Sequence, residues 1–167
     1  MSNPSRQFAE PRSSHAQLAL AFDRDEWELV VTLPRRVLLA AVAAAPADGR
    51  RAAEGIAGIE AIASGLASPS PLVREIVGAI YAESHQDHEE PTTDADVITV
   101  RTLAACRYAA SVVATRCGPD DATGYREWLL HIAAVVSGVA QGVTAPAQTR
   151  GPTMARFLYA LEGVLRP

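Results

Sequence analysis

The stretch from residue 25 to residue 66 constrains the fold more than any other part of the chain. It contains two runs in which apolar side chains recur at three- and four-residue steps, separated by Pro46-Ala47-Asp48-Gly49. That spacing places the apolar side chains on one face of an α-helix, and the segment with Pro and Gly is typical of a turn. The stretch therefore predicts two amphipathic helices folded against each other.

Pro34 interrupts the first of these runs. Proline has no backbone N–H and pushes Leu33 away from helical angles. We therefore expect either a short helix ending near Thr32 with a new helix starting at Pro34, or one kinked helix. A β-strand over 27–33 is the alternative, because the segment contains β-branched residues that favour strands. No hairpin turn nearby offers a partner strand, so we prefer the helix.

The second run predicts a buried stripe on a helix that extends to residue 66. The stripe consists of Ala52, Ile56, Ile59, Ile62, Ala63 and Leu66. Gly55, Gly58 and Gly65 lie in the same run, and each costs about 1 kcal/mol relative to alanine inside a helix. These glycines either mark a close approach of two backbones or reflect an Ala- and Gly-rich sequence, and both interpretations stay open.

Four further helices are predicted in the rest of the chain. Ser70 is a candidate cap with Pro71 at the first helical position of a helix ending near residue 83. Asp94 or Asp96 caps the next helix. Its predicted stripe is Val100, Leu103, Cys106, Ala110, Val113 and Cys117. Two more helices are expected over 120–141 and 153–165.

Gly118 is expected to close the helix that carries this stripe, the fourth of the six predicted helices, with Pro119 just beyond it. The most polar and acidic stretch, 83–96, is a predicted surface loop between two three-helix halves. Residues 1–22 are expected to be a flexible, disordered N-terminal tail. The sequence therefore predicts an all-α fold, a single-domain bundle of about six helices over 23–167.

The charged residues of the chain indicate which classes of binding partner are not expected. The formal net charge is −4, and no arginine cluster exceeds a pair, such as Arg35-Arg36. Nucleic-acid binding normally requires a basic face, so we expect no nucleic-acid partner. The chain contains no lysine, and its fifteen basic residues are all arginine. We interpret this as the codon bias of a bacterium with a GC-rich genome.

The positions of the cysteines and the hydropathy pattern indicate in which cellular compartment the protein is expected. Cys106 and Cys117 lie on one predicted helix, about 16 Å apart at the helical rise of about 1.5 Å per residue, too far to form a disulfide with each other. Two reduced thiols suit a cytoplasmic protein. Every long apolar stretch is broken by Pro, Arg, His or Gln before reaching the ~18–20 residues of a transmembrane helix, so no membrane span is expected.

Two sets of residues resemble known bacterial proteins. The first is Glu26-Trp27, Pro34, an Ala-rich run, Asp48-Gly49 and Glu54, and the second is Tyr125-Arg126-x-Trp128-Leu129-Leu130-x-Ile132-Ala133-x-x-Val136. Both resemble uncharacterised bacterial all-helical proteins, which implies a fold and no activity. The Ala-Asp-Gly segment followed by Glu54 also resembles the tellurite-resistance TerB-like domain. In that domain an acidic pair near the helix turn is implicated in metal binding.

Candidate metal ligands occur in two places. His85 and His88, flanked by acidic residues in the predicted loop, could hold Zn²⁺ or a similar divalent ion. Asp48 and Glu54 could form a cation site across the first helical turn. The alternative for the histidines is a solvated polar loop, and for Asp48 and Glu54 a helix-capping role.

No catalytic motif accompanies these residues, so we expect a protein that is not an enzyme and that needs no cofactor. The first predicted helix and the helix after the acidic loop each carry alanine residues on more than one side of the helix. A helix that is apolar all round must be buried in its own core or against a partner. We therefore expect protein–protein contact, with a homo-oligomer as the simplest partner. The alternative is a metal-binding or stress-response domain that uses the four residues above.

Overall fold

The computed structural model describes residues 18–45, 51–82, 94–138 and 151–166. Within these ranges the chain forms six α-helices, one short 3₁₀ helix and no strand, which confirms the predicted all-α fold. The elements are α2 (Arg24–Ala44), α3 (Arg51–Ala63), η1 (Ser64–Ala67), α4 (Pro71–Ala82), α5 (Ala95–Arg116), α6 (Pro119–Val136) and α7 (Pro152–Leu165). Three helices precede the polar stretch and three follow it.

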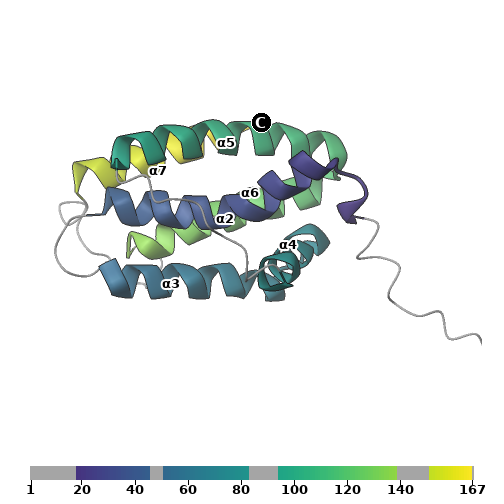
Figure 1. Cartoon of the computed structure of the whole chain (residues 1–167), viewed down its shortest axis with the longest axis horizontal. Coiled ribbons are helices and arrows are strands. Elements are labelled where there is room, and N and C mark those ends of the chain that lie inside the picture. The colour runs from purple at the N-terminus through teal and green to yellow at the C-terminus, as the bar shows by residue number, and fades with distance from the viewer. Residues whose placement is uncertain (1–17, 46–50, 83–93, 139–150, 167) are drawn as a thin grey trace, which may run out of the picture.

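The helices are arranged in three layers (Figure 1). α5 and α7 lie on one side, α2 and α6 lie in the middle, and α3 and α4 lie on the other side. α2 and α6 each contact every other helix of the described chain. The small side chains of α2, including Ala40, Ala41 and Ala44, are therefore buried by the protein's own core. The alanine-rich faces of α2 require no outside partner.

α2 is one helix that runs through Pro34. It begins with a reciprocal cap, because Asp23 Oδ1 accepts a hydrogen bond from the Glu26 N–H at 2.8 Å and Glu26 Oε2 accepts one from the Asp23 N–H at 3.0 Å. Phe22, at the end of the predicted tail, is instead a core residue, and its ring lies 5.7 Å from that of Trp27. The bundle core therefore includes a residue before the predicted boundary at residue 23.

The buried face of α3 agrees with the predicted stripe only at Ile62 among its large side chains. Gly58, Ala61 and Ile62 face the core, whereas Ile56 and Ile59 are 60% and 58% exposed. A Cβ at Gly58 would overlap Leu38 Cδ1 of α2 and lie 3.1 Å from Val136 Cγ2 of α6. The face with Gly58 and Ala61 packs inward because it lets α3 approach its neighbours closely, and Ile56 and Ile59 are left outside.

The start of α4 is fastened to the start of α6. Ser70 caps α4, because its Oγ accepts a hydrogen bond from the Val73 N–H at 3.3 Å, and Pro71 occupies the first helical position as predicted. The same hydroxyl donates to Asp121 Oδ1 at 2.6 Å. Asp121 Oδ1 also accepts from the Leu72 N–H at 3.3 Å. One carboxylate of α6 thereby stabilises the first turn of α4.

The boundaries around α5 and α6 differ in part from the prediction. Asp94 caps α5, so the helix starts inside the predicted acidic loop. Gly118 does not close α5 but precedes α6 in an extended conformation (φ −71°), with Pro119 at the first helical position. α6 ends at Val136, before the predicted end at residue 141, and Gly138 has the left-handed φ of 74°.

The predicted stripe of α5 is confirmed only in part. Cys106 and Val113 are buried as predicted, but Val100 is 67% exposed. Thr102, Ala109 and Val112, which lie outside the predicted stripe, are also buried. Among the described residues, α5 is the one helix long and apolar enough to cross a membrane by length and composition alone. In the fold it packs against α2, α6 and α7, and the expectation of no membrane span stays a prediction.

Candidate functional site

The predicted metal ligands are not brought together among the described residues. Asp48, His85 and His88 lie outside the described ranges. Glu54 lies in the first turn of α3, where it is half-buried and its Oε2 is shielded from solvent. The described part of the chain contains no group of three His, Cys, Asp or Glu residues that could hold a metal ion. Both metal sites stay predictions.

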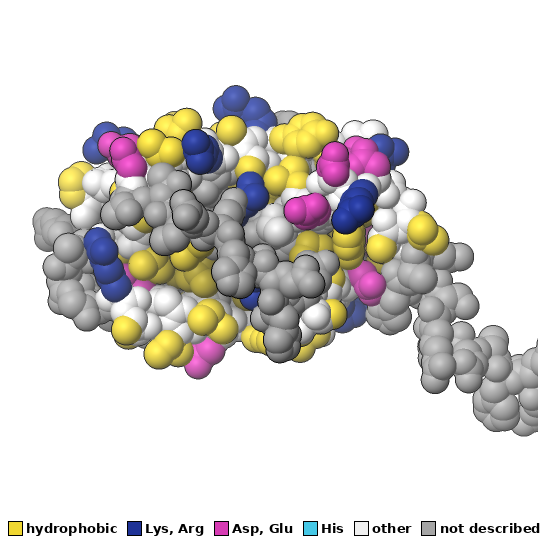
Figure 2. Space-filling view, viewed as in Figure 1, with side chains coloured by type: hydrophobic (Ala, Val, Ile, Leu, Met, Phe, Trp, Pro, Cys, Tyr) yellow, Lys and Arg dark blue, Asp and Glu magenta, His cyan; other side chains and the backbone are white. Residues whose placement is uncertain are grey.

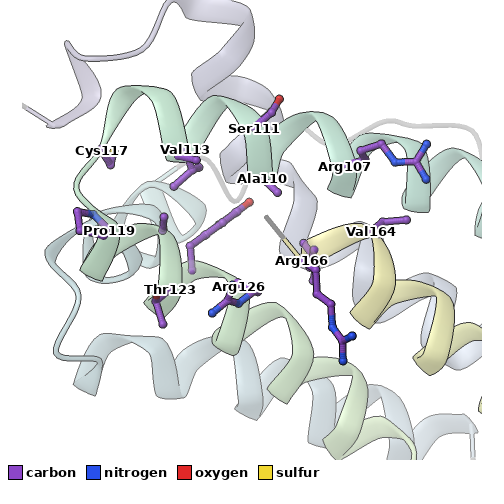
Figure 3. A pocket seen from close by; sticks show the side chains of 14 residues that line it. Arg107, Ala110, Ser111, Val113, Cys117, Pro119, Thr123, Arg126, Val164 and Arg166 are labelled. Atoms are coloured by element: carbon purple, nitrogen blue, oxygen red, sulfur yellow. The ribbon is translucent and has the colours of Figure 1, made fainter.

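A pocket of about 480 Å³ opens between α5, the first half of α6 and the end of α7 (Figure 3). Its wall is mainly apolar, with side chains from all three helices. The apolar residues are Ala110, Val113, Ala114, Pro119, Ala122, Val164 and Leu165. Ser111 and Thr123 add hydroxyl groups. This size and composition are typical of small-molecule sites in proteins.

Three arginines line the same pocket, although the chain as a whole is acidic. They are Arg107 from α5, Arg126 from α6 and Arg166 at the end of α7, and none of the residues lining the pocket is acidic. Arg166 Nη2 forms an ion pair with Glu162 Oε1 at 2.7 Å. Neither Arg107 nor Arg126 forms a salt bridge with another described residue. The pocket therefore has a cationic lining.

The pocket is polarised from end to end. In Figure 3, Cys117 and Pro119 lie at one end, and Arg107, Val164 and Arg166 lie at the other. Burial is the larger cause of the raised pKa of the Cys117 thiol, and the charge of Asp121 is the smaller one. A negative charge therefore acts at the end opposite Arg107 and Arg166. An anionic group is favoured at the arginine end and disfavoured at the cysteine end.

Two ionisable groups of the pocket wall, the Cys117 thiol and the Tyr125 hydroxyl, are held in their neutral forms. Burial, with a smaller contribution from Asp121, raises the pKa of Cys117 to about 11. Burial also raises the pKa of Tyr125 well above its ordinary value, and the Tyr125 hydroxyl donates to the Val30 carbonyl oxygen at 2.9 Å. A thiol activated for nucleophilic attack has a lowered pKa. These groups therefore suit the wall of a binding site better than the attacking group of an enzyme.

A second candidate site is the outward face of α3 and η1. Ile56, Ile59 and Leu66 are 60%, 58% and 54% exposed. Together with Ala52 and Ala63 they follow alternating steps of four and three residues, the spacing of the seam in a helix pair. In Figure 2, hydrophobic side chains gather along the lower edge of the molecule, where Figure 1 places α3. We call these five residues the α3 strip.

The sequence did not single out the pocket. Arg107, Arg126 and Arg166 are far apart in the chain, and none of them belongs to a basic cluster. The prediction put Cys117 on the buried stripe of α5, but it is only partly buried and forms part of the pocket wall. Arg107 has no acidic residue within four positions in the sequence, whereas Arg126 directly precedes a glutamate and Arg166 follows one by four positions. None of these local patterns reveals which helices converge.

Comparison of the chain with protein-family models, with curated proteins and with solved structures gives no match.

Proposed function

We propose that this protein is a non-enzymatic, cytoplasmic helical-bundle protein that acts through protein–protein contacts, with a second copy of the same chain as the partner. The observation that carries the proposal is the α3 strip. Large aliphatic side chains at consecutive seam positions lose contact with water when a second helix covers them, which favours association.

The packing of the other helices supports α3 as the surface of self-association. The apolar faces of α2 are already buried in the core. On α3 the Gly and Ala face packs inward, which turns Ile56 and Ile59 outward. Two α3 strips packed side by side would bury the same residues in both copies, as a two-fold symmetric dimer requires. The heptad-like alternation supplies the register of that pairing.

The neutral state of the pocket thiol supports a binding role over a catalytic one. A Cys117 thiol with a pKa of about 11 is almost entirely protonated near neutral pH, and only the thiolate is a strong nucleophile. Tyr125 is engaged by the Val30 carbonyl. The arginines of the pocket can bind and orient an anion, but they cannot serve as general bases near neutral pH.

Light scattering coupled to size-exclusion chromatography of the full chain tests the proposal. We expect a mass twice the monomer mass of 17.7 kDa, and a return to the monomer mass in the double variant Ile56→Glu, Ile59→Glu. Leu39→Glu is the matched control, because Leu39 is also 60% exposed but lies on α2. A monomer at the highest soluble concentration, or a dimer unaffected by the double variant, would contradict self-association through α3.

A further inference from the structure

The pocket between α5, α6 and α7 combines an apolar wall with cationic side chains, in a chain of formal net charge −4. Its wall is mostly hydrocarbon, and its charged groups are all cationic. A purely apolar ligand would leave the guanidinium groups unused. A small hydrophilic anion would leave the apolar wall against water.

We propose that this pocket binds a small ligand with an apolar body and a single anionic head group, of which an aliphatic carboxylate is the simplest example. The apolar body would lie against Val113, Ala122 and Pro119. The head group would lie beside Arg126, which Figure 3 shows between the two ends of the pocket, on the side that faces Arg107 and Arg166. This function is separate from the self-association proposed for the α3 strip.

The placement of Arg126 argues that it is the main contact of the head group. Its side chain is half-buried, whereas those of Arg107 and Arg166 are exposed. A partly desolvated guanidinium interacts more strongly with a carboxylate, and its planar donors match the two carboxylate oxygens. Arg166 already shares its charge with Glu162. Arg107 has no such partner among the described residues and would add attraction at the rim.

The charges at the other end fix the orientation of the ligand. Asp121 acts on Cys117 and holds the start of α4 through Ser70 and Leu72. A head group at that end would be repelled by the charge of Asp121, which acts on Cys117 although Asp121 does not itself line the pocket. The positive end of the α6 dipole is likewise already faced by Asp120 and Asp121. The anion therefore lies at the arginine end, with its hydrocarbon portion pointing towards Cys117.

Isothermal titration of the full chain with decanoate, below its micelle concentration, tests this proposal. We expect one site per chain. 1-Decanol should bind at least about tenfold more weakly, because it lacks the charge that Arg126 contacts. Decyltrimethylammonium should not bind. Equal affinity for decanoate and decanol, or many equivalent sites, would overturn the proposal.

Three variants locate the site. Arg126→Gln should weaken decanoate binding about tenfold or more. Arg101 is an exposed arginine of α5 that does not line the pocket, so the control variant Arg101→Gln should leave decanoate binding unchanged. Ala110→Phe should abolish binding by filling the pocket, with circular dichroism confirming that the helices remain. Bound decanoate should also slow the alkylation of Cys117. Unchanged affinity in both Arg126→Gln and Ala110→Phe would overturn the assignment.

These outcomes are independent of the oligomer experiment. The double variant Ile56→Glu, Ile59→Glu removes the α3 strip and lies outside the pocket lining, so it should bind decanoate as the unaltered chain does.

Discussion

The hydroxyl of Tyr125 donates a hydrogen bond to the backbone carbonyl of Val30 at 2.9 Å, from α6 to α2. In a regular helix this carbonyl would accept from the N–H of residue 34, and proline has none. Tyr125 supplies the missing donor from 95 positions further along the chain. A buried proline can therefore lie inside a continuous helix, because another helix satisfies the carbonyl that the proline leaves without an intrahelical partner.

Removal of this donor should destabilise the fold. Tyr125→Phe keeps the ring but leaves the buried Val30 carbonyl without its hydrogen bond, so we expect the free energy of unfolding to fall by about 1–3 kcal/mol. Urea denaturation followed by circular dichroism measures the change. Tyr159→Phe should change stability little, because Tyr159 is 81% exposed.

A double-mutant cycle assigns this loss to the pairing of Tyr125 with the carbonyl. Pro34→Ala restores an N–H that can donate to Val30 O. Tyr125→Phe should then cost less in the Pro34→Ala background than in the unaltered chain. Equal costs in the two backgrounds would show that the hydroxyl does not compensate for the proline.

The helices could be predicted from the sequence where apolar side chains gather on one side. α4 is an example, since Leu72, Val73 and Ile76 share a face and are all fully buried. Ser70 and Pro71 also marked the start of this helix correctly. Local signals suffice here, because the helix has one strongly apolar face and a distinct beginning.

The stripe of α3 was predicted correctly at Ile62 and wrongly at Ile56 and Ile59, for a physical reason. A stripe of isoleucines is the stronger hydrophobic signal, but Gly58 of α3 and Gly65 of η1 make room for side chains of neighbouring helices. A Cβ at Gly65 would lie 2.8 Å from Val77 Cγ2 and 2.9 Å from the Trp128 ring. Trp128 Nε1 also donates to the Ala61 carbonyl at 3.2 Å. These contacts depend on partners in other helices, which helical periodicity does not reveal.

The candidate pocket could not be predicted at all, for a related reason. Its arginines come from three helices, and only the packing of α5, α6 and α7 brings them to one cavity. The metal candidates were chosen from neighbours in sequence instead. Of those four residues, only Glu54 lies within the described part of the chain.

Two glycines of α3 should respond in opposite ways to the same substitution. Gly58→Ala should lower the free energy of unfolding by about 1–3 kcal/mol, because the added methyl group meets Leu38 and Val136 in a packed core. Gly55→Ala should raise it by up to about 1 kcal/mol, because a Cβ there meets nothing within 4 Å and alanine favours the helix. Urea denaturation of both variants gives the comparison. A similar change in both would contradict close packing at Gly58.

The ion pair of Glu26 with Arg116 should make stability depend on acidic pH. Arg116 Nη2 lies 3.0 Å from Glu26 Oε1 and Arg116 Nε lies 3.1 Å from Oε2. The hydrogen bond from Arg116, followed by that from the Asp23 N–H, lowers the pKa of Glu26 in the folded chain. The unfolded chain has the ordinary value of about 4.3. The contribution of this ion pair to the free energy of unfolding is therefore complete well above about pH 4.3, and it is lost as the pH falls through the pKa of Glu26 in the folded chain.

The comparison of the unaltered chain with Glu26→Gln isolates this contribution. The difference in urea midpoint should be constant from about pH 7 to pH 5 and should shrink as the pH falls below about 4. Glu28→Gln, an exposed position of the same helix, is the control. A difference that does not depend on pH would show that the Glu26 carboxylate is not stabilised in the folded state.

Cys117 should react slowly with alkylating reagents although it is partly exposed. Its pKa of about 11 gives a thiolate fraction near pH 8 on the order of a hundredfold below that of an ordinary cysteine with a pKa of about 8.5. The rate of iodoacetamide alkylation, followed by mass spectrometry, should rise steadily from pH 8 to about pH 11.

Cys117→Ser should abolish this reaction in the folded chain, because Cys106 is fully buried with its pKa raised to about 12 by burial. Both thiols should react at ordinary rates in urea. Fast labelling of folded Cys117 at pH 8 would instead show that its thiol is ionised and available for chemistry.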